Sequence, residues 1–148
     1  MDLSYISDSE EAYEKFFAEC DATASCKFIL AERHIRSILK AIAGSSALLG
    51  VFAYAAEGYN FPPEFDRHVS VKGNKKSVAL PNGNRDFLAF AYCLMMEIDI
   101  QNIDFHKLLN EFYYHPDGMT ESYRMFCGDV ILPMKAAVRL LREMASDK

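Results

Sequence analysis

The sequence predicts an all-α fold, a bundle of five to six helices with one small β-hairpin arm at about residues 68–80. Apolar residues recur at intervals of three and four through most of the 148 residues, which is the helical period. Two of the helical segments are apolar on nearly every face and therefore need other helices to cover them. One segment, residues 59–83, breaks the period with adjacent prolines and Gly-Asn turns.

The first part of the chain predicts three helices. Ser7 or Ser9 caps a first helix that runs to about Cys20, with acidic residues in its opening turns, where the helix dipole favours them. A second helix, residues 23–44, carries a core-facing apolar stripe and a basic outer face. A third, residues 46–57, is apolar nearly all round, so we expect it to be mostly buried.

The arm at residues 59–83 is expected to be an irregular, non-helical insertion that carries the hairpin, within a single domain of residues 1–148. It reverses the local charge. Residues 59–86 hold five basic and three acidic residues, a net charge of +2, whereas the rest of the chain carries −7. A long irregular segment in a domain is often functional.

We therefore interpret the arm as a partner-binding element with aromatic residues at its base and lysines at its tip: Tyr59, Phe61, Phe65, Lys72, Lys75 and Lys76. In an alternative interpretation, the three aromatic residues only fix the arm to the helical bundle.

Two helices are predicted directly after the arm. Asn84 caps residues 85–98, whose core again leaves little polar surface. Asp104 caps residues 105–114, which end at a turn sequence.

Thr120 caps the last helix, in which apolar residues follow a heptad spacing for three repeats. Pro133 lies inside this helix, so the sequence predicts either a kink at Pro133 or a break at Gly128 and Asp129. The unbroken apolar spacing favours one kinked helix.

Composition limits the classes of function. The four cysteines form no C-x-x-C pair, which indicates free thiols. The N-terminus lacks the pattern of a secretory signal, and the longest apolar run is about ten residues, too short to span a membrane. We therefore expect a cytoplasmic protein with no membrane contact. The net charge of −5 argues against nucleic acid as a partner.

The densest polar cluster is residues 97–106, which holds the weak catalytic candidates Glu97, Asp99, Asp104 and His106. Carboxylates beside a histidine bind divalent cations or act as an acid/base pair. The spacing does not match a calcium loop, and no known metal-binding or cofactor-binding motif is present, so we expect no metal and no cofactor. The acidic helix-loop-helix is similar, over about ten residues, to that of bacterial tellurite-resistance TerB-like domains. It lacks their full acidic pattern, and no residue role follows from the resemblance.

Our leading hypothesis is a non-enzymatic domain that forms a homo-oligomer or binds a protein partner. It rests on a surplus of apolar side chains near the C-terminus: Tyr113, Tyr114, Met119, Met125, Phe126, Ile131 and Leu140. One alternative is a metal-assisted or acid/base hydrolase centred on residues 97–106. A second alternative is contact with nucleic acid through the lysine-rich arm.

Overall fold

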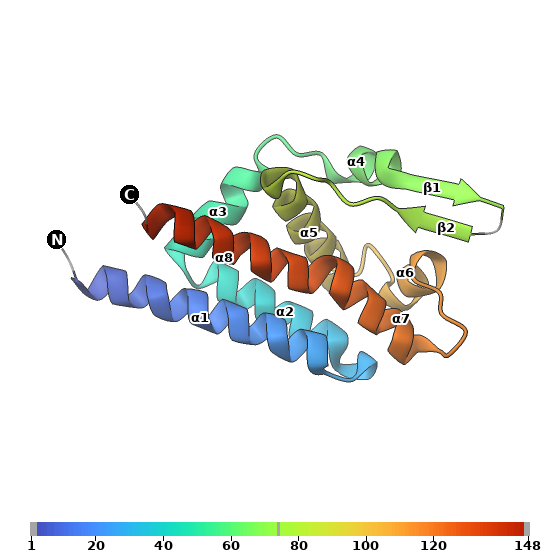
Figure 1. The fold of residues 1–148 in the computed structure, drawn as a ribbon, viewed down its shortest axis with the longest axis horizontal. Helices are drawn as coiled ribbons and strands as arrows, with labels where there is room; N and C mark the ends of the chain where they lie inside the picture. The colour runs from blue at the N-terminus through green and yellow to red at the C-terminus, as the bar shows by residue number, and fades with distance from the viewer. Residues whose placement is uncertain (1–2, 74, 147–148) are drawn as a thin grey trace.

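Two long helices lie side by side across one face of the molecule (Figure 1). The first is α1 (Leu3–Ser25), and the second is the continuous helix formed by α7 (Met119–Phe126), η2 (Cys127–Ile131) and α8 (Leu132–Ser146). The computed structural model describes residues 3–73 and 75–146. The start of α1 and the end of α8 lie at the same end of the molecule (Figure 1).

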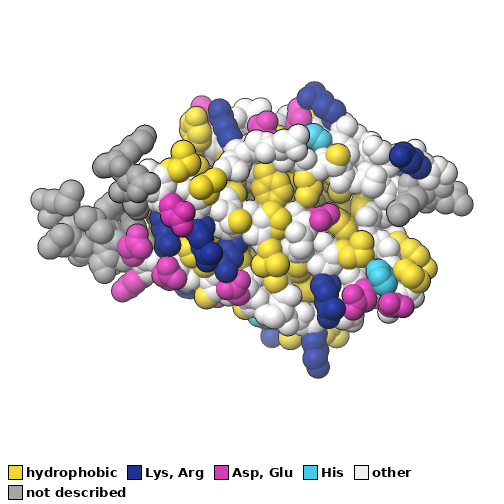
Figure 2. All heavy atoms as spheres, in the orientation of Figure 1, with side chains coloured by type: hydrophobic (Ala, Val, Ile, Leu, Met, Phe, Trp, Pro, Cys, Tyr) yellow, Lys and Arg dark blue, Asp and Glu magenta, His cyan; other side chains and the backbone are white. Residues whose placement is uncertain are grey.

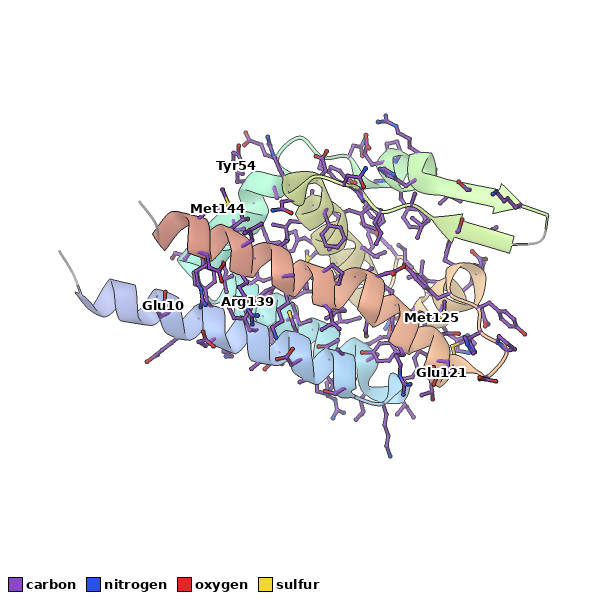
Figure 3. The ribbon with its side chains drawn as sticks, viewed as in Figure 1. Glu10, Tyr54, Glu121, Met125, Arg139 and Met144 are labelled. Carbon is purple, nitrogen blue, oxygen red and sulfur yellow. The ribbon has the colours of Figure 1, made fainter. Side chains whose placement is uncertain are left out.

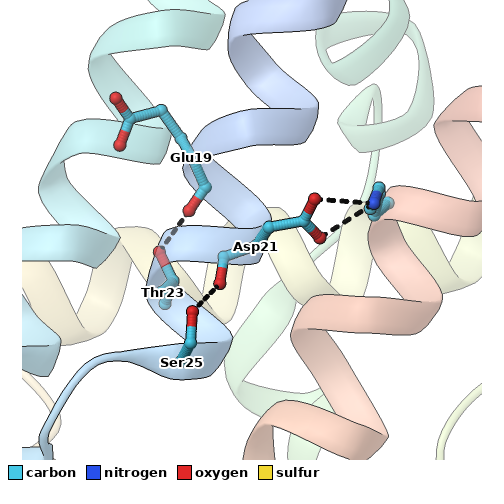
Figure 4. A network of polar contacts seen from close by, with 5 residues as sticks. Glu19, Asp21, Thr23 and Ser25 are labelled. Atoms are coloured by element: carbon cyan, nitrogen blue, oxygen red, sulfur yellow. Dashed lines mark hydrogen bonds and ion pairs between the residues drawn. The ribbon is translucent and has the colours of Figure 1, made fainter.

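Basic residues of α8 hold it against the acidic α1. The Lys135 ammonium lies 2.8 Å and 2.9 Å from the two carboxylate oxygens of Asp21 (Figure 4). Arg142 donates to Glu14 over 2.9 Å, and its guanidinium lies 5.0 Å from the centre of the Phe17 ring. Each pair is partly exposed, so it aligns the two helices and contributes at most about 1 kcal/mol to stability.

Behind this pair lie the shorter helices of the core. The 3₁₀ turn η1 (Phe28–Leu30) leads into α2 (Ala31–Ala43), and Ser45 caps α3 (Ser46–Ala56) by accepting the Leu48 N–H. The helix α5 (Asn84–Asp99) contacts α2, α3 and α8, and also a short helix of the arm, α4 (Phe61–His68). Its apolar sequence follows from this central position, because a helix that its neighbours cover on most sides has little face for polar residues.

The arm contains a helix that the sequence analysis missed. The segment α4 (Phe61–His68) precedes the antiparallel strands β1 (Val69–Lys72) and β2 (Lys75–Val78). The expectation of a non-helical arm is wrong here because Pro62 and Pro63 lie in the first turn of α4, where a helix needs no N–H donor. The predicted hairpin is confirmed, with Val69 opposite Val78.

The last helix is continuous, as the kinked alternative requires, and it does not break at Gly128 and Asp129. The turn η2 is π-helical: the Leu132 N–H bonds to the carbonyl of Cys127, five residues earlier. Pro133 has no N–H to donate and would clash with the carbonyl four residues before it in a regular α-helix. The wider π-turn removes that conflict. The cap is Gly118, with φ 111°, and not Thr120.

The chain is 76% helical, which confirms the all-α class. Across the described residues it has seven helices if α7, η2 and α8 count as one, whereas five to six were predicted. The first helix also runs five residues past the predicted end at Cys20, and the second begins at Ala31. The remaining predicted helix over residues 105–114 is α6 (Phe105–Phe112), capped by Asp104 as expected.

The buried apolar residues of these helices form one continuous core, and the four cysteines are free. Three residues of the predicted C-terminal surplus, Tyr113, Phe126 and Ile131, lie inside this core. Among the described residues, no single helix is both long and apolar enough to cross a membrane. Residues 28–43 and 46–56 reach that length and composition only as a pair, bent by 103°.

Candidate functional site

The candidate acidic residues at 97–106 do not converge. Asp99 accepts a hydrogen bond from Arg36 of α2 over 2.9 Å. Asp104 caps its own helix by accepting the Lys107 N–H over 3.0 Å. The backbone carbonyl of Glu97 accepts the N–H groups of Asn102 and Ile103, which closes the turn between α5 and α6. Asp99, Asp104 and the Glu97 carbonyl therefore each have a separate structural role, and the three act at different points between α5 and α6.

His106 is exposed, and its ring centre lies 6.0 Å from that of Phe28. With Asp104 and Glu32 it lines a hollow of about 390 Å³. Within residues 3–73 and 75–146, no three His, Cys, Asp or Glu side chains are placed to hold a metal ion. The hydrolase alternative therefore gains no support from this geometry.

The aromatic residues of the arm lie against the bundle. Phe61 is buried, and the ring centres of Phe61 and Phe65 lie 5.6 Å and 6.0 Å from that of Phe90 in α5. Phe65 also meets Phe112 of α6 edge-to-face at 5.6 Å. These contacts match the alternative in which the aromatic base fixes the arm in place. They leave the tip of the arm as the part that faces outward.

Tyr59 lies beside this aromatic base. Its hydroxyl is buried without a hydrogen-bond partner among the described residues. Burial raises its pKa to about 12, and the carboxylate of Glu64 adds to this effect. Burial also raises the pKa of Tyr113, which lies near Asp129, and the pKa of Tyr123, which hydrogen-bonds Cys26.

These tyrosines predict a loss of stability at high pH. In the unfolded chain a tyrosine ionises near pH 10, whereas the folded chain keeps the phenol protonated to higher pH. The unfolded state therefore binds fewer protons above about pH 10, and stability falls as pH rises from about 10 towards 12. Urea unfolding midpoints measured across this range should decrease, and the decrease should be smaller in Tyr59→Phe. If the unfolding midpoint decreased equally with pH in the two proteins, the loss of stability would not come from Tyr59.

The lysines of the arm take different positions. Lys72 and Lys75 face each other across the turn of the hairpin; Lys72 is exposed, and the side chain of Lys75 lies outside the described part of the structure. The Lys76 ammonium lies 3.7 Å from a carboxylate oxygen of Glu111 in α6. Val71, opposite Lys76, is 61% exposed.

A groove of about 650 Å³ lies where the hairpin meets α6 and the start of the last helix, α7. Its lining combines basic, aromatic and apolar side chains: Lys72, Lys76, Asn110, Glu111, Phe112, Tyr114, Pro116 and Met125. Tyr114 and Met125 are 68% and 44% exposed, although both are large apolar side chains. Figure 3 shows Met125 on α7, at the end of the molecule that carries the hairpin. We call this the hairpin groove.

Sequence reasoning found the two lysines and the exposed apolar residues of this site but not the groove itself. Lys72 and Lys76 were predicted from the arm, and Tyr114 and Met125 from the apolar surplus. These residues come together only because β2 lies along α6 in the folded chain. No local pattern in the sequence signals that contact.

A second hollow, of about 520 Å³, runs between α8 and the segment that enters α5. Leu80, Pro81, Phe87, Pro133 and Leu140 line it. Figure 2 shows hydrophobic side chains gathered at the centre of this face. Its lining lacks the cationic side chains that mark the hairpin groove.

Comparison of the chain with protein-family models, with curated proteins and with solved structures finds no significant match. The functional interpretation therefore rests on the geometry of the chain alone.

Proposed function

We propose that this chain is a non-enzymatic protein-binding domain that docks an acidic segment of a partner protein in the hairpin groove. The observation that carries the proposal is the lining of that groove, which combines Lys72 and Lys76 with the exposed Tyr114 and Met125. Aromatic and methionine side chains are enriched in protein interfaces, and a few buried anchors, tyrosine among them, carry most of the binding energy.

Charge complementarity selects the partner. The arm region carries +2 while the rest of the chain carries −7, so an acidic segment is attracted to the hairpin and repelled elsewhere. The contact between Lys76 and Glu111 is long, at 3.7 Å, and partly exposed. Such a pair is worth less than about 1 kcal/mol, and a partner carboxylate is able to replace Glu111.

A segment of another protein fits better than a second copy of this chain. Two acidic residues near the start of α1, Glu10 and Glu14, already lie beside Arg142 of the same chain at 3.6 Å and 2.9 Å. A second copy would have to release these pairs to present its acidic helix. Self-association is therefore an outcome that the test must separate from partner binding.

The test measures fluorescence anisotropy of labelled peptides that combine glutamates with leucine or phenylalanine at varied spacing. We expect the purified chain to bind some of these peptides and to ignore the same peptides with lysine in place of glutamate. Lys72→Glu combined with Lys76→Glu should weaken binding by roughly tenfold or more. The matched control is Lys27→Glu with Lys40→Glu, which changes the same charge at exposed positions on other elements.

Three results would overturn the proposal. One is failure of all acidic peptides to bind. Another is equal weakening in the two double variants, which would reflect net charge alone. The third is preference for a labelled single-stranded RNA, which would favour the nucleic-acid alternative. Light scattering on the same samples distinguishes self-association from partner binding. If the wild-type chain is a dimer that dissociates in Lys72→Glu with Lys76→Glu, a second copy of the chain occupies the hairpin groove.

A further inference from the structure

The C-terminal end of α1 is closed by side chains from the other end of the sequence. A helix leaves its last carbonyls without partners, and α1 ends at Ser25 with no glycine cap. The buried Thr23 carbonyl accepts a hydrogen bond of 2.5 Å from the hydroxyl of Tyr123 in α7. Thr23 and Tyr123 are 100 positions apart in the chain.

Two cysteine thiols meet at the same carbonyl. The Cys26 sulfur lies 3.3 Å from the Thr23 oxygen and 3.4 Å from the Tyr123 hydroxyl. The Cys127 sulfur lies 4.0 Å from the Thr23 oxygen. Since both sulfurs lie within 4.0 Å of one atom, they are near neighbours in space although they come from opposite ends of the chain.

We propose that Cys26 and Cys127 are an oxidisable pair that forms a reversible disulfide between the end of α1 and the π-helical turn η2. This inference is independent of the proposed binding function. It rests on the shared carbonyl and on the difference in exposure between the two thiols. Cys26 is half-buried, whereas Cys127 is buried, so an oxidant reaches Cys26 first.

The chemistry takes two steps with a hydroperoxide as the oxidant. The Cys26 sulfur attacks the peroxide and becomes a sulfenic acid, while the peroxide is reduced to an alcohol or to water. The Cys127 sulfur then attacks the sulfenic sulfur, the S–S bond forms, and the hydroxyl leaves as water with the thiol proton. A small dithiol reverses the reaction by disulfide exchange.

The order of the steps agrees with the surroundings of Cys127. Burial raises the pKa of its thiol to about 11, so at neutral pH it stays protonated and does not react with the oxidant itself. The second step should therefore become faster as pH rises towards 11. Neither cysteine lies in regular α-helix. Cys26 lies between the end of α1 and η1, and Cys127 is the first residue of η2.

The test treats the purified chain with dilute hydrogen peroxide, blocks the remaining thiols, and maps the cysteines by mass spectrometry without reduction. We expect the monomer to lose two hydrogen atoms and to yield a peptide that joins Cys26 to Cys127. Cys26→Ser and Cys127→Ala should abolish this product. Cys93→Ser, at another half-buried cysteine, should leave it unchanged.

A second readout covers the case in which Cys127→Ala folds poorly. Because the bond closes a loop of about a hundred residues, oxidised wild-type protein should melt roughly 10 °C higher than its reduced form, and Cys26→Ser should show no such difference. Oxidation of Cys26 to a sulfinic acid without a cross-link, or a disulfide that uses Cys20 or Cys93, would overturn the proposal.

Discussion

Replacing Phe90 with alanine is expected to lower the free energy of unfolding by about 3–5 kcal/mol, the usual cost of removing a buried aromatic ring. Phe90 is fully buried in α5. Its ring centre lies within 6.2 Å of those of Phe61, Phe65 and His68, the three rings by which α4 contacts the bundle. The substitution therefore removes the surface on which the arm rests.

Chemical unfolding with urea measures this loss, and amide hydrogen exchange locates it. We expect exchange in α4 and the hairpin to accelerate more than exchange in α1 and α8. The control is Tyr54→Ala, which also removes an aromatic ring but from a position 62% exposed; it should cost less than about 1 kcal/mol. A loss below about 1 kcal/mol in Phe90→Ala would show that the arm does not depend on this cluster.

Replacing Tyr123 with phenylalanine should lower the free energy of unfolding by about 1–3 kcal/mol. The change removes one hydroxyl, keeps the ring, and takes away the strongest donor to the buried Thr23 carbonyl. The ring itself still packs edge-to-face on Phe105 at 6.0 Å, so the lost hydrogen bond accounts for the effect.

Tyr114→Phe is the matched control, because it removes a tyrosine hydroxyl from a residue 68% exposed and should leave stability unchanged. If Tyr123→Phe is also unchanged, the Cys26 thiol alone satisfies the carbonyl. Cys26→Ala combined with Tyr123→Phe decides between these cases, since it removes both closer donors and leaves the carbonyl only the Cys127 thiol at 4.0 Å.

Local signals in the sequence predicted the helices that carry them. The apolar spacing located α3, α5 and α6 to within two residues. Asp104 caps α6 and Gly44 ends α2 as predicted, since each acts on its own helix end. The predicted cap Asn84 is instead the first residue of α5, whose N-cap is Gly83. The hairpin was predicted for the same reason, since its turn and its paired valines are close in the chain. Where the cause of a structure lies within a few residues, the pattern reveals it.

Other features depend on residues far apart in the chain. α1 extends to Ser25 because Tyr123 of α7 and Lys135 of α8 bind its last turns. The sequence near Ser25 contains no signal of these contacts. α4 was missed because adjacent prolines were taken as a break, when they fit the first turn of a helix. The hairpin groove needs β2 beside α6, a contact between segments that are separated by all of α5.

The π-helical turn η2 has a consequence for how the chain tolerates changes in length. A π-turn contains one residue more than the α-helical turn that it replaces. Deleting one residue from 127–131 and replacing Pro133 would therefore restore a regular α-helix without rotating either end. Phe126 before the turn and Met134 after it would remain buried. We therefore expect the middle of the last helix to absorb a one-residue deletion locally, while α7 and α8 keep their packing.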